Sequence, residues 1–230
     1  MPECVLLNLG RLDYAGALAM QQRLVAERKQ GLVPDHLLLV EHPHVITLGR
    51  NGHQENVLAS SEVLSRAGIS FFPTDRGGDV TYHGPGQLVG YPILDLREWK
   101  RDVGAYVRAI EQVLIDTLSD YGIAAGRIPK LTGVWVGERK IAAIGVHISR
   151  WVTSHGFALN VTTDLSYFQY IVPCGLTKPV TSMAAVSPQG PHASVEQVGQ
   201  KLAAHFGRIF EREMAPPEGA LALSGKGEPI

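Results

Sequence analysis

Residues 133–148, GVWVGERKIAAIGVHI, decide the class of fold. Two apolar runs rich in valine and isoleucine flank the polar stretch at residues 137–139, a pattern typical of two antiparallel strands joined by a tight turn. We therefore predict a β-hairpin that turns at Gly137 and Glu138. Other strand-like runs also come in adjacent pairs, which favours a sheet whose consecutive strands are neighbours.

The rest of the chain supplies further strands and three clear helices. Helical periodicity begins after Asp13, Asp102 and Ser194, each of which is a suitable N-cap, and a short helix is expected near residues 62–67. The other strand-like runs are HLLLVEH, VITLGR, ISFFPT, QLVGYPILDL and SHGFALNVT, at residues 36–42, 45–50, 69–74, 87–96 and 154–162. We predict an α/β (α+β) fold with a mixed β-sheet flanked by α-helices, and not the strict alternation of a Rossmann fold.

Length and composition bound the domain organisation. The 230 residues are 45% hydrophobic and 19% charged, which is enough to bury one large core. We expect a single domain over residues 1–214. Residues 215–230, APPEGALALSGKGEPI, are rich in proline and glycine and are expected to form a flexible tail.

Charge and cysteine content exclude several classes of protein. The formal net charge is −1 at pH 7 and no run of like charges occurs, so we expect no nucleic-acid partner and no membrane partner. Cys4 and Cys174 are far apart in sequence and do not have the spacing of a disulfide framework or a zinc site. The first residues lack the pattern of a signal peptide, and we expect a cytoplasmic location.

A glycine-rich stretch at residues 75–92, DRGGDVTYHGPGQLVGYP, allows close approach to the backbone. It lacks the Gly-Lys-Ser/Thr ending of a phosphate-binding loop, which makes a nucleotide site a poor explanation. Two interpretations remain, a bulged turn between two strands and a loop that binds a ligand. Arg76 and His83 favour the ligand, because both can donate hydrogen bonds.

Histidines suggest a metal site only weakly. His42 and His44 have the alternate spacing that places both side chains on one face of a strand, and His53 is nearby. No carboxylate or cysteine stands at a supporting spacing. We predict no metal.

Cysteine is the remaining candidate nucleophile, because the chain lacks the Gly-x-Ser-x-Gly elbow of a serine hydrolase. Cys4 begins an apolar run, where a thiol usually behaves as a small buried hydrophobe. Cys174 lies between Pro173 and Gly175 in an irregular connection, where it is either an exposed nucleophile or inert. A nucleophilic thiolate needs a cationic or basic partner, and Lys140 is the candidate, its side chain pointing either out to solvent or into a site.

Three stretches together resemble one family. RGGDVTYHGPGQLVGYP, GVWVGERKIAAIGVHISRWVTSHGFALNV and VPCG, within residues 37–183, closely resemble the octanoyl-[acyl-carrier-protein]:protein octanoyltransferases of lipoate biosynthesis, also called lipoate-protein ligase B. The resemblance implies the fold of the biotin and lipoate protein ligases, with no cofactor. It also implies that octanoyl-acyl carrier protein is the donor, and that the acceptors are lipoyl domains of 2-oxoacid dehydrogenase E2 subunits and the glycine cleavage H protein.

The same resemblance assigns roles to residues. Cys174 matches the nucleophile that carries the acyl thioester, and Lys140 matches the lysine that activates it and relays protons. The implied substrate-binding residues are Arg76, Gly77, Gly78, Asp79, Val80, Thr81, Tyr82, His83, Ala143, Ile144, Gly145, Gly156, Phe157 and Ala158. We expect a monomer; the alternatives are an ATP-dependent lipoate or biotin ligase and a non-catalytic acyl-binding adaptor.

Overall fold

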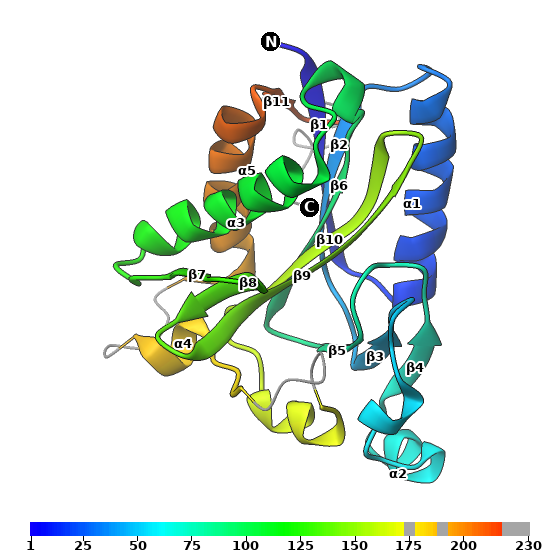
Figure 1. Ribbon diagram of the computed structural model, residues 1–230, viewed down its shortest axis with the longest axis vertical. Helices are drawn as coiled ribbons and strands as arrows, with labels where there is room; N and C mark the ends of the chain where they lie inside the picture. The colour runs from blue at the N-terminus through cyan, green and yellow to red at the C-terminus, as the bar shows by residue number, and fades with distance from the viewer. Residues whose placement is uncertain (173–177, 188–192, 218–230) are drawn as a thin grey trace, which may run out of the picture.

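The protein is described by a computed structural model at residues 1–172, 178–187 and 193–217. An eight-stranded mixed sheet has the order β11-β1-β2-β6-β10-β9-β8-β7, and a three-stranded sheet has the order β4-β3-β5. In Figure 1, helices α3 and α5 cover one face of the large sheet and α1 covers the other. The predicted fold class is therefore confirmed.

The strands are β1 (Glu3–Arg11), β2 (Asp35–Glu41), β3 (Val45–Leu48), β4 (Ser70–Pro73), β5 (Val80–His83), β6 (Gln87–Ile93), β7 (Gly126–Ile128), β8 (Leu131–Val136), β9 (Arg139–Ser149), β10 (Val152–Asn160) and β11 (Glu213–Ala215). The helices are α1 (Tyr14–Lys29), α2 (Ser61–Arg66), α3 (Val103–Ser119), α4 (Met183–Val186) and α5 (Val195–Phe210). Short 3-10 helices are η1 (Gln54–Asn56), η2 (Leu96–Glu98) and η3 (Leu165–Tyr170). None of the helices described has the length and apolar character needed to cross a membrane.

The predicted hairpin joins β8 and β9. Val136 pairs with Arg139, and Gly137 takes a positive φ of 58° in the turn. A second hairpin follows, in which Val152 of β10 pairs with Ser149 of β9. These three antiparallel strands form one side of the large sheet, beside β6 (Figure 1).

Capping residues fix the starts of the helices as the sequence predicts. The carboxylate of Asp13 accepts a hydrogen bond from Gly16 N at 2.8 Å, and that of Asp102 accepts one from Ala105 N at 2.9 Å. Ser194 and Gln197 form the predicted capping box of α5. Each bond satisfies a backbone donor that the first helical turn leaves without a partner.

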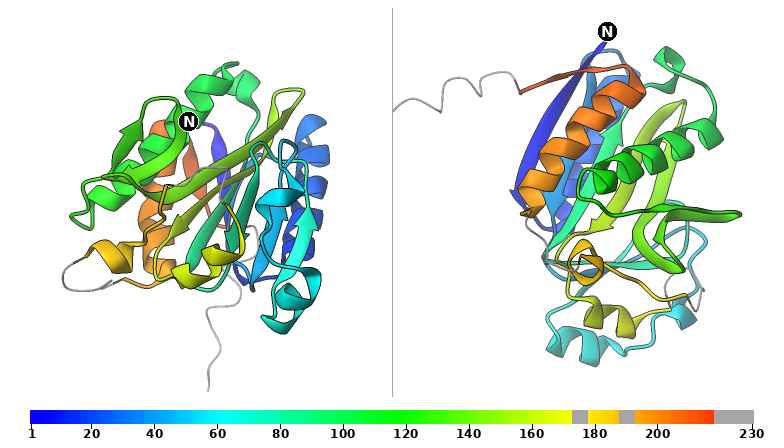
Figure 2. Two further views of the ribbon diagram at one scale, coloured as in Figure 1. Left: turned by 60° about the horizontal axis from the view of Figure 1, so that its bottom comes forward. Right: turned by 90° about the vertical axis from the view of Figure 1, so that its left-hand side faces the viewer.

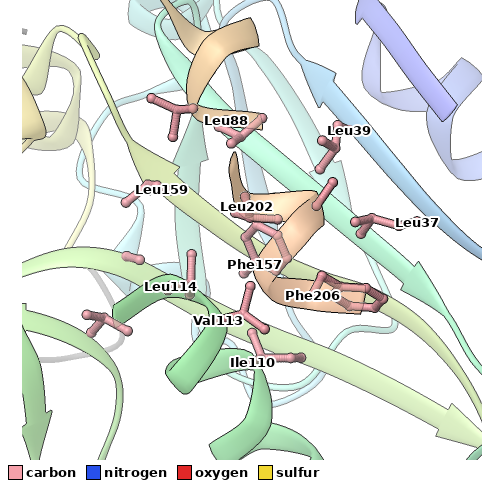
Figure 3. Packing of buried hydrophobic residues seen from close by; sticks show 14 of the residues in the cluster. Leu37, Leu39, Leu88, Ile110, Val113, Leu114, Phe157, Leu159, Leu202 and Phe206 are labelled. Atoms are coloured by element: carbon pink, nitrogen blue, oxygen red, sulfur yellow. The ribbon is translucent and has the colours of Figure 1, made fainter. Parts of the chain in front are cut away.

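The main core lies between the large sheet and helices α3 and α5 (Figure 2). Figure 3 shows its centre, where Phe157 of β10 meets Ile110 and Val113 of α3 and Phe206 of α5. Gly90 of β6 pairs with Phe157, whose ring occupies the place that a side chain at position 90 would take. The aromatic ring and the glycine therefore complement one another across two strands.

The glycine-rich stretch is more regular than expected. Residues 80–83 form β5, which pairs with β3, and residues from Gln87 onward form β6 of the large sheet. Irregular glycine-containing backbone remains on either side of β5. At the other end of the chain, Ala215 of β11 pairs with Val5 of β1. Residues 218–230 of the predicted tail lie outside the described residues.

Candidate active site

Lys140, the second residue of β9, is half-buried and pairs with Trp135 across the hairpin. Its Nζ lies 4.9 Å from the centre of the Trp135 ring, within the range of a cation–π contact. Gly133 of β8 has a φ of 121° and lies beside the lysine stem, and a Cβ there would lie only 2.7 Å from Ala142 O. The amine is held over an aromatic face beside a cavity that Thr81 and Val180 also line.

Cys174 lies outside the described residues, but the chain on both sides of its segment is anchored. Before it, Val172 N donates to Asn56 O at 2.8 Å. After it, the chain bonds directly to Lys140: Lys140 N donates to Pro179 O and Thr181 N donates to Lys140 O, both at 2.9 Å. Pro179 follows Cys174 by five residues. The backbone thus ties the candidate base to the segment that follows the candidate nucleophile.

A second cavity continues from the one beside Lys140, because Thr81, Ala143 and Ala158 line both. Ten of the predicted substrate-binding residues line this second cavity: Arg76, Gly78, Thr81, His83, Ala143, Ile144, Gly145, Gly156, Phe157 and Ala158. Tyr14, Val89, Tyr91 and His155 complete the lining. We call it the strand cavity, because it follows β9 and β10.

Small residues line the strand cavity along β9 and β10. Side chains alternate between the two faces of a strand, so Gly156 and Ala158 lie on the face opposite to Phe157. Ala143 and Gly145 pair with Ala158 and Gly156 across the two strands. Four small residues therefore stand side by side. At the two glycines this allows close approach of other backbone, because a Cβ at Gly145 would lie 2.8 Å from Gly77 O and one at Gly156 would overlap Gly90 O.

Glycines allow the loop around Gly77 to pack closely against β9. Gly77 N donates to Val146 O at 2.9 Å, and a Cβ at Gly145 would lie 2.8 Å from Gly77 O. Arg76 lies beside them with a buried guanidinium that donates to Thr47 O at 2.7 Å and to Thr47 Oγ1 at 2.9 Å. The loop is thereby held directly against β9 at the edge of the strand cavity.

Other residues of the loop support it from behind. The carboxylate of Asp79 accepts hydrogen bonds from His53 N at 3.1 Å and from Asn56 Nδ2. Val80 is fully buried in a smaller core with Ile46 and Leu64. Tyr82 is also fully buried there, and its hydroxyl lies 2.8 Å from Nδ1 of His44. These side chains position the loop.

A chain of buried hydrogen bonds runs from His83 to Lys140. His83 Nδ1 donates to Gln87 Oε1 at 2.8 Å, and Gln87 Nε2 donates to Asn160 Oδ1 at 2.9 Å. Asn160 Nδ2 donates to Thr181 O at 2.9 Å, and Thr181 in turn bonds Lys140. Sequence reasoning missed Gln87, Asn160 and Thr181. The available signal for the first two was a polar residue at the end of an apolar run, since Gln87 begins β6 and Asn160 ends β10.

The histidines near the strand cavity are neutral. Burial, with a smaller contribution from the neighbouring His42, lowers the pKa of His83 to about 3. Burial also lowers the pKa of His42. Apart from the Arg76 guanidinium, which donates hydrogen bonds to Thr47, the side chains that line the strand cavity carry no charge, and this suits an apolar ligand.

His42 and His44 do not share a strand face, so that expectation is wrong. Strand β2 ends at Glu41, and the two rings turn to different partners. His42 donates to Leu12 O at 2.7 Å and accepts from the Tyr91 hydroxyl at 2.8 Å, whereas His44 stacks on Tyr167. Within residues 1–172, 178–187 and 193–217, no group of three His, Cys, Asp or Glu side chains is placed to hold a metal ion.

Cys4 is the buried hydrophobe that the sequence predicts. It has no exposed surface and packs in the main core, and burial raises the pKa of its thiol well above the ordinary value. The thiolate form is thereby suppressed, which makes Cys4 a poor nucleophile.

Comparison with known proteins identifies the family of the chain. Residues 13–207 match the model of the lipoyl protein ligase A/B catalytic domain. A protein of Solibacter usitatus named octanoyltransferase is 76% identical over 94% of this chain and 97% of its own length. Another of that name from Koribacter versatilis is 54% identical over 90% of this chain and 84% of its own length.

Among solved structures, a putative lipoate protein ligase from T. acidophilum with bound lipoic acid superposes with a TM-score of 0.74. It is 16% identical and is matched over 93% of this chain and 88% of its own. A biotin protein ligase from Aquifex aeolicus is more distant, with a TM-score of 0.55 at 12% identity over 92% of this chain and 71% of its own. These likenesses support the fold, and the sequence matches support the family. The chain belongs to the lipoyl protein ligase A/B catalytic domain family and, within it, to the octanoyltransferases.

Proposed function

We propose that this octanoyltransferase carries the octanoyl group as a thioester on Cys174, with Lys140 as its proton donor and acceptor. The donor is octanoyl-acyl carrier protein. The acceptor is the lysine of a lipoyl domain, as in 2-oxoacid dehydrogenase E2 subunits or the glycine cleavage H protein. The protein acts as a monomer in the cytoplasm and needs no cofactor.

The observation that carries this proposal is the place of Lys140. Its backbone bonds Pro179 and Thr181, and its side chain lines a cavity that continues into the strand cavity. A nucleophile near this amine would therefore have an acyl-binding space beside it. The neutral histidines and the row of small residues favour an alkyl chain over a charged ligand there.

In the first half-reaction, the thiolate of Cys174 attacks the carbonyl carbon of the octanoyl thioester. A new bond forms between Sγ and the acyl carbon, and the bond to the phosphopantetheine sulfur breaks. Lys140, in its ammonium form, donates a proton to the departing thiolate. One thioester replaces another of similar energy, so this half-reaction is readily reversible.

In the second half-reaction, the amine of the acceptor lysine attacks the acyl group on Cys174. An amide bond forms, the bond to Sγ breaks, and the proton lost by the amine passes to Lys140. The amide is much more stable than the thioester, which drives the transfer to completion. Lys140 then returns to its ammonium form for the next cycle.

An ATP-dependent ligase is the alternative with a related fold. Lipoate-protein ligase A bound with ATP superposes with a TM-score of 0.71, but its identity to this chain is 16%, so it supports only the fold. Such a ligase activates a free acid as an adenylate and has no need of Cys174. Relatives at 76% and 54% identity that are named octanoyltransferase favour transfer between proteins.

Intact-mass spectrometry tests the proposal. Incubation with octanoyl-acyl carrier protein, without acceptor or nucleotide, is expected to add one octanoyl group, which peptide mapping places on Cys174. Addition of a lipoyl domain should remove the group and acylate the domain lysine. Acylation at Cys4 or at no cysteine, or transfer that requires octanoate and ATP, would overturn the mechanism.

A further inference from the structure

A third cavity lies beyond the strand cavity, on the side away from Lys140. It is formed between α1 and the β9–β10 hairpin and is lined by polar residues that include Gln21, Lys29, Asp75, His147 and Arg150. His155 lines both this outer cavity and the strand cavity. Three cavities therefore follow β9 and β10 in a row, and His155 stands where the second meets the third.

We propose that His155 is the end stop of the acyl-binding cavity and sets the longest chain that the enzyme transfers. This inference rests on the proposed function, because it takes the strand cavity to be the acyl site. It goes further by assigning chain-length selection to one side chain. That side chain lies in neither the glycine-rich loop nor the Cys174 segment.

The imidazole is held as a rigid barrier. His155 is 2% exposed, its Nε2 lies 2.7 Å from Asp75 Oδ1, and its backbone N donates to Gln21 Oε1 at 2.8 Å. Asp75 also contacts His147 Nδ1 at 3.1 Å, so two rings hold one carboxylate. Burial lowers the pKa of His155 despite the opposing effect of Asp75, so the ring that meets the cavity is neutral.

The barrier has features that packing alone does not explain. Among the described residues, buried His155 Nδ1 has no hydrogen-bond partner, and neither has Gln21 Nε2. Unsatisfied buried polar atoms are destabilising, and an apolar side chain would fill the same space without that cost. His155 also has a positive φ of 55°, which most side chains disfavour. A polar ring in a strained backbone conformation indicates selection for position.

The position fits the length of the substrate. The cavity beside Lys140 meets the strand cavity at Ala158. His155 precedes Ala158 by three residues on β10. Three residues of a strand span about 10 Å, which is close to the length of an extended octanoyl chain. A chain two or four carbons longer would meet the imidazole. Without the imidazole, the chain would pass into the outer cavity.

Chain-length profiles test this inference. His155→Gly removes the ring and suits the positive φ, and His155→Asn provides a second, smaller side chain that tolerates the same conformation. For each variant, kcat/KM is measured with octanoyl-, decanoyl-, dodecanoyl- and palmitoyl-carrier protein and one lipoyl-domain acceptor. His147→Ala is the matched control, because His147 contacts the same carboxylate but lines only the outer cavity.

We expect the dodecanoyl-to-octanoyl ratio of kcat/KM to rise about tenfold or more in His155→Gly. The rise in His155→Asn should be smaller, and the ratio in His147→Ala should stay at the wild-type value. If wild-type enzyme acylates Cys174 with octanoyl but both His155 variants keep the wild-type ratio, the end stop is wrong and the proposed function stands. A rise in His147→Ala equal to that in His155→Gly also overturns it. If wild-type enzyme never acylates Cys174, the proposed function fails and this inference with it.

Discussion

Strand β10 has two faces that differ sharply in side-chain size. Toward α3 and α5 it presents Phe157 and Leu159, which fill the main core (Figure 3). Toward the glycine-rich loop it presents Gly156 and Ala158, which line the strand cavity. One strand thus stabilises the fold with large residues and provides binding space with small ones.

Polarity differs between the faces in the same way. The main core consists of apolar side chains and Cys4. The opposite side has a second apolar cluster packed against α1, but it also buries His83, Gln87 and Asn160, joined by hydrogen bonds. Buried hydrogen bonds of this kind add little net stability. They fix the orientation of the side chains, because leaving one buried partner without its bond is strongly destabilising. We therefore expect substitutions toward α3 and α5 to change mainly stability, and substitutions around the strand cavity to change mainly function.

The two cysteines give the largest expected effect. Cys174→Ser should lower octanoyl transfer by at least about 10³-fold, because a hydroxyl is a far weaker nucleophile than a thiolate. Cys4→Ser should leave kcat/KM nearly unchanged and lower only the free energy of unfolding, by about 1–3 kcal/mol, because it buries a hydroxyl in the core. Transfer assays and urea unfolding of both variants measure this. If Cys4→Ser is fully folded but inactive, the main core and the strand cavity do not have separate roles.

Lys140 gives the next largest effect. Lys140→Ala should slow both half-reactions by about 10²- to 10⁴-fold, the range of general acid–base catalysis. Lys140→Arg should retain part of the charge effect on the thiolate but should not relay protons. Alkylation of Cys174 by iodoacetamide as a function of pH separates the two roles. An unchanged midpoint in Lys140→Ala would remove Lys140 from the activation of the thiol.

A substitution in the main core should affect stability alone. Phe206→Ala is expected to lower the free energy of unfolding by about 3–5 kcal/mol, because the ring is fully buried and leaves a void. The exposed Val103→Ala should change it by less than about 0.5 kcal/mol. Urea unfolding gives both values. A changed ratio of decanoyl to octanoyl transfer in folded Phe206→Ala would show that the two faces are coupled.

The smallest expected effect is a loss of stability in acid that is caused by His83, which lines the strand cavity. The pKa of His83 is about 3 when folded and about 6.5 when unfolded, so between these values the unfolded chain binds the extra proton. Stability from this group is present above about pH 6.5 and falls as the pH is lowered, by about 2 kcal/mol between pH 7 and pH 5. His83→Gln should flatten this slope in urea unfolding. If the stability of His83→Gln falls with pH as steeply as that of the wild type, His83 is not the source of the acid sensitivity.

Local features of the fold were predictable from sequence, and long-range features were not. The caps at Asp13 and Ser194 and the turn at Gly137 depend on neighbouring residues only. Strand β5 was missed because its partner β3 lies more than 30 residues earlier, and a run of four residues with glycines around it has no strong periodicity of its own.

The candidate site follows the same division. The resemblance named ten residues that line the strand cavity, whereas the link from Gln87 through Asn160 to Thr181 emerges only when β6, β10 and the segment before α4 come together. His155 was missed as a site residue because its role depends on two cavities and on Asp75, 80 residues earlier. The pairing of Lys140 with Cys174 stays a prediction.

The contact between Gly90 and the Phe157 ring has an evolutionary consequence. A methyl group at position 90 would overlap that ring, so neither position can change independently. Mutational paths that enlarge residue 90 must first pass through a smaller residue at 157, which by itself leaves a hole in the core. We expect either single change to lower stability and a matched pair of changes to restore it. Because the effect of a change at one position depends on the residue at the other, we expect Gly90 and Phe157 to change together or not at all.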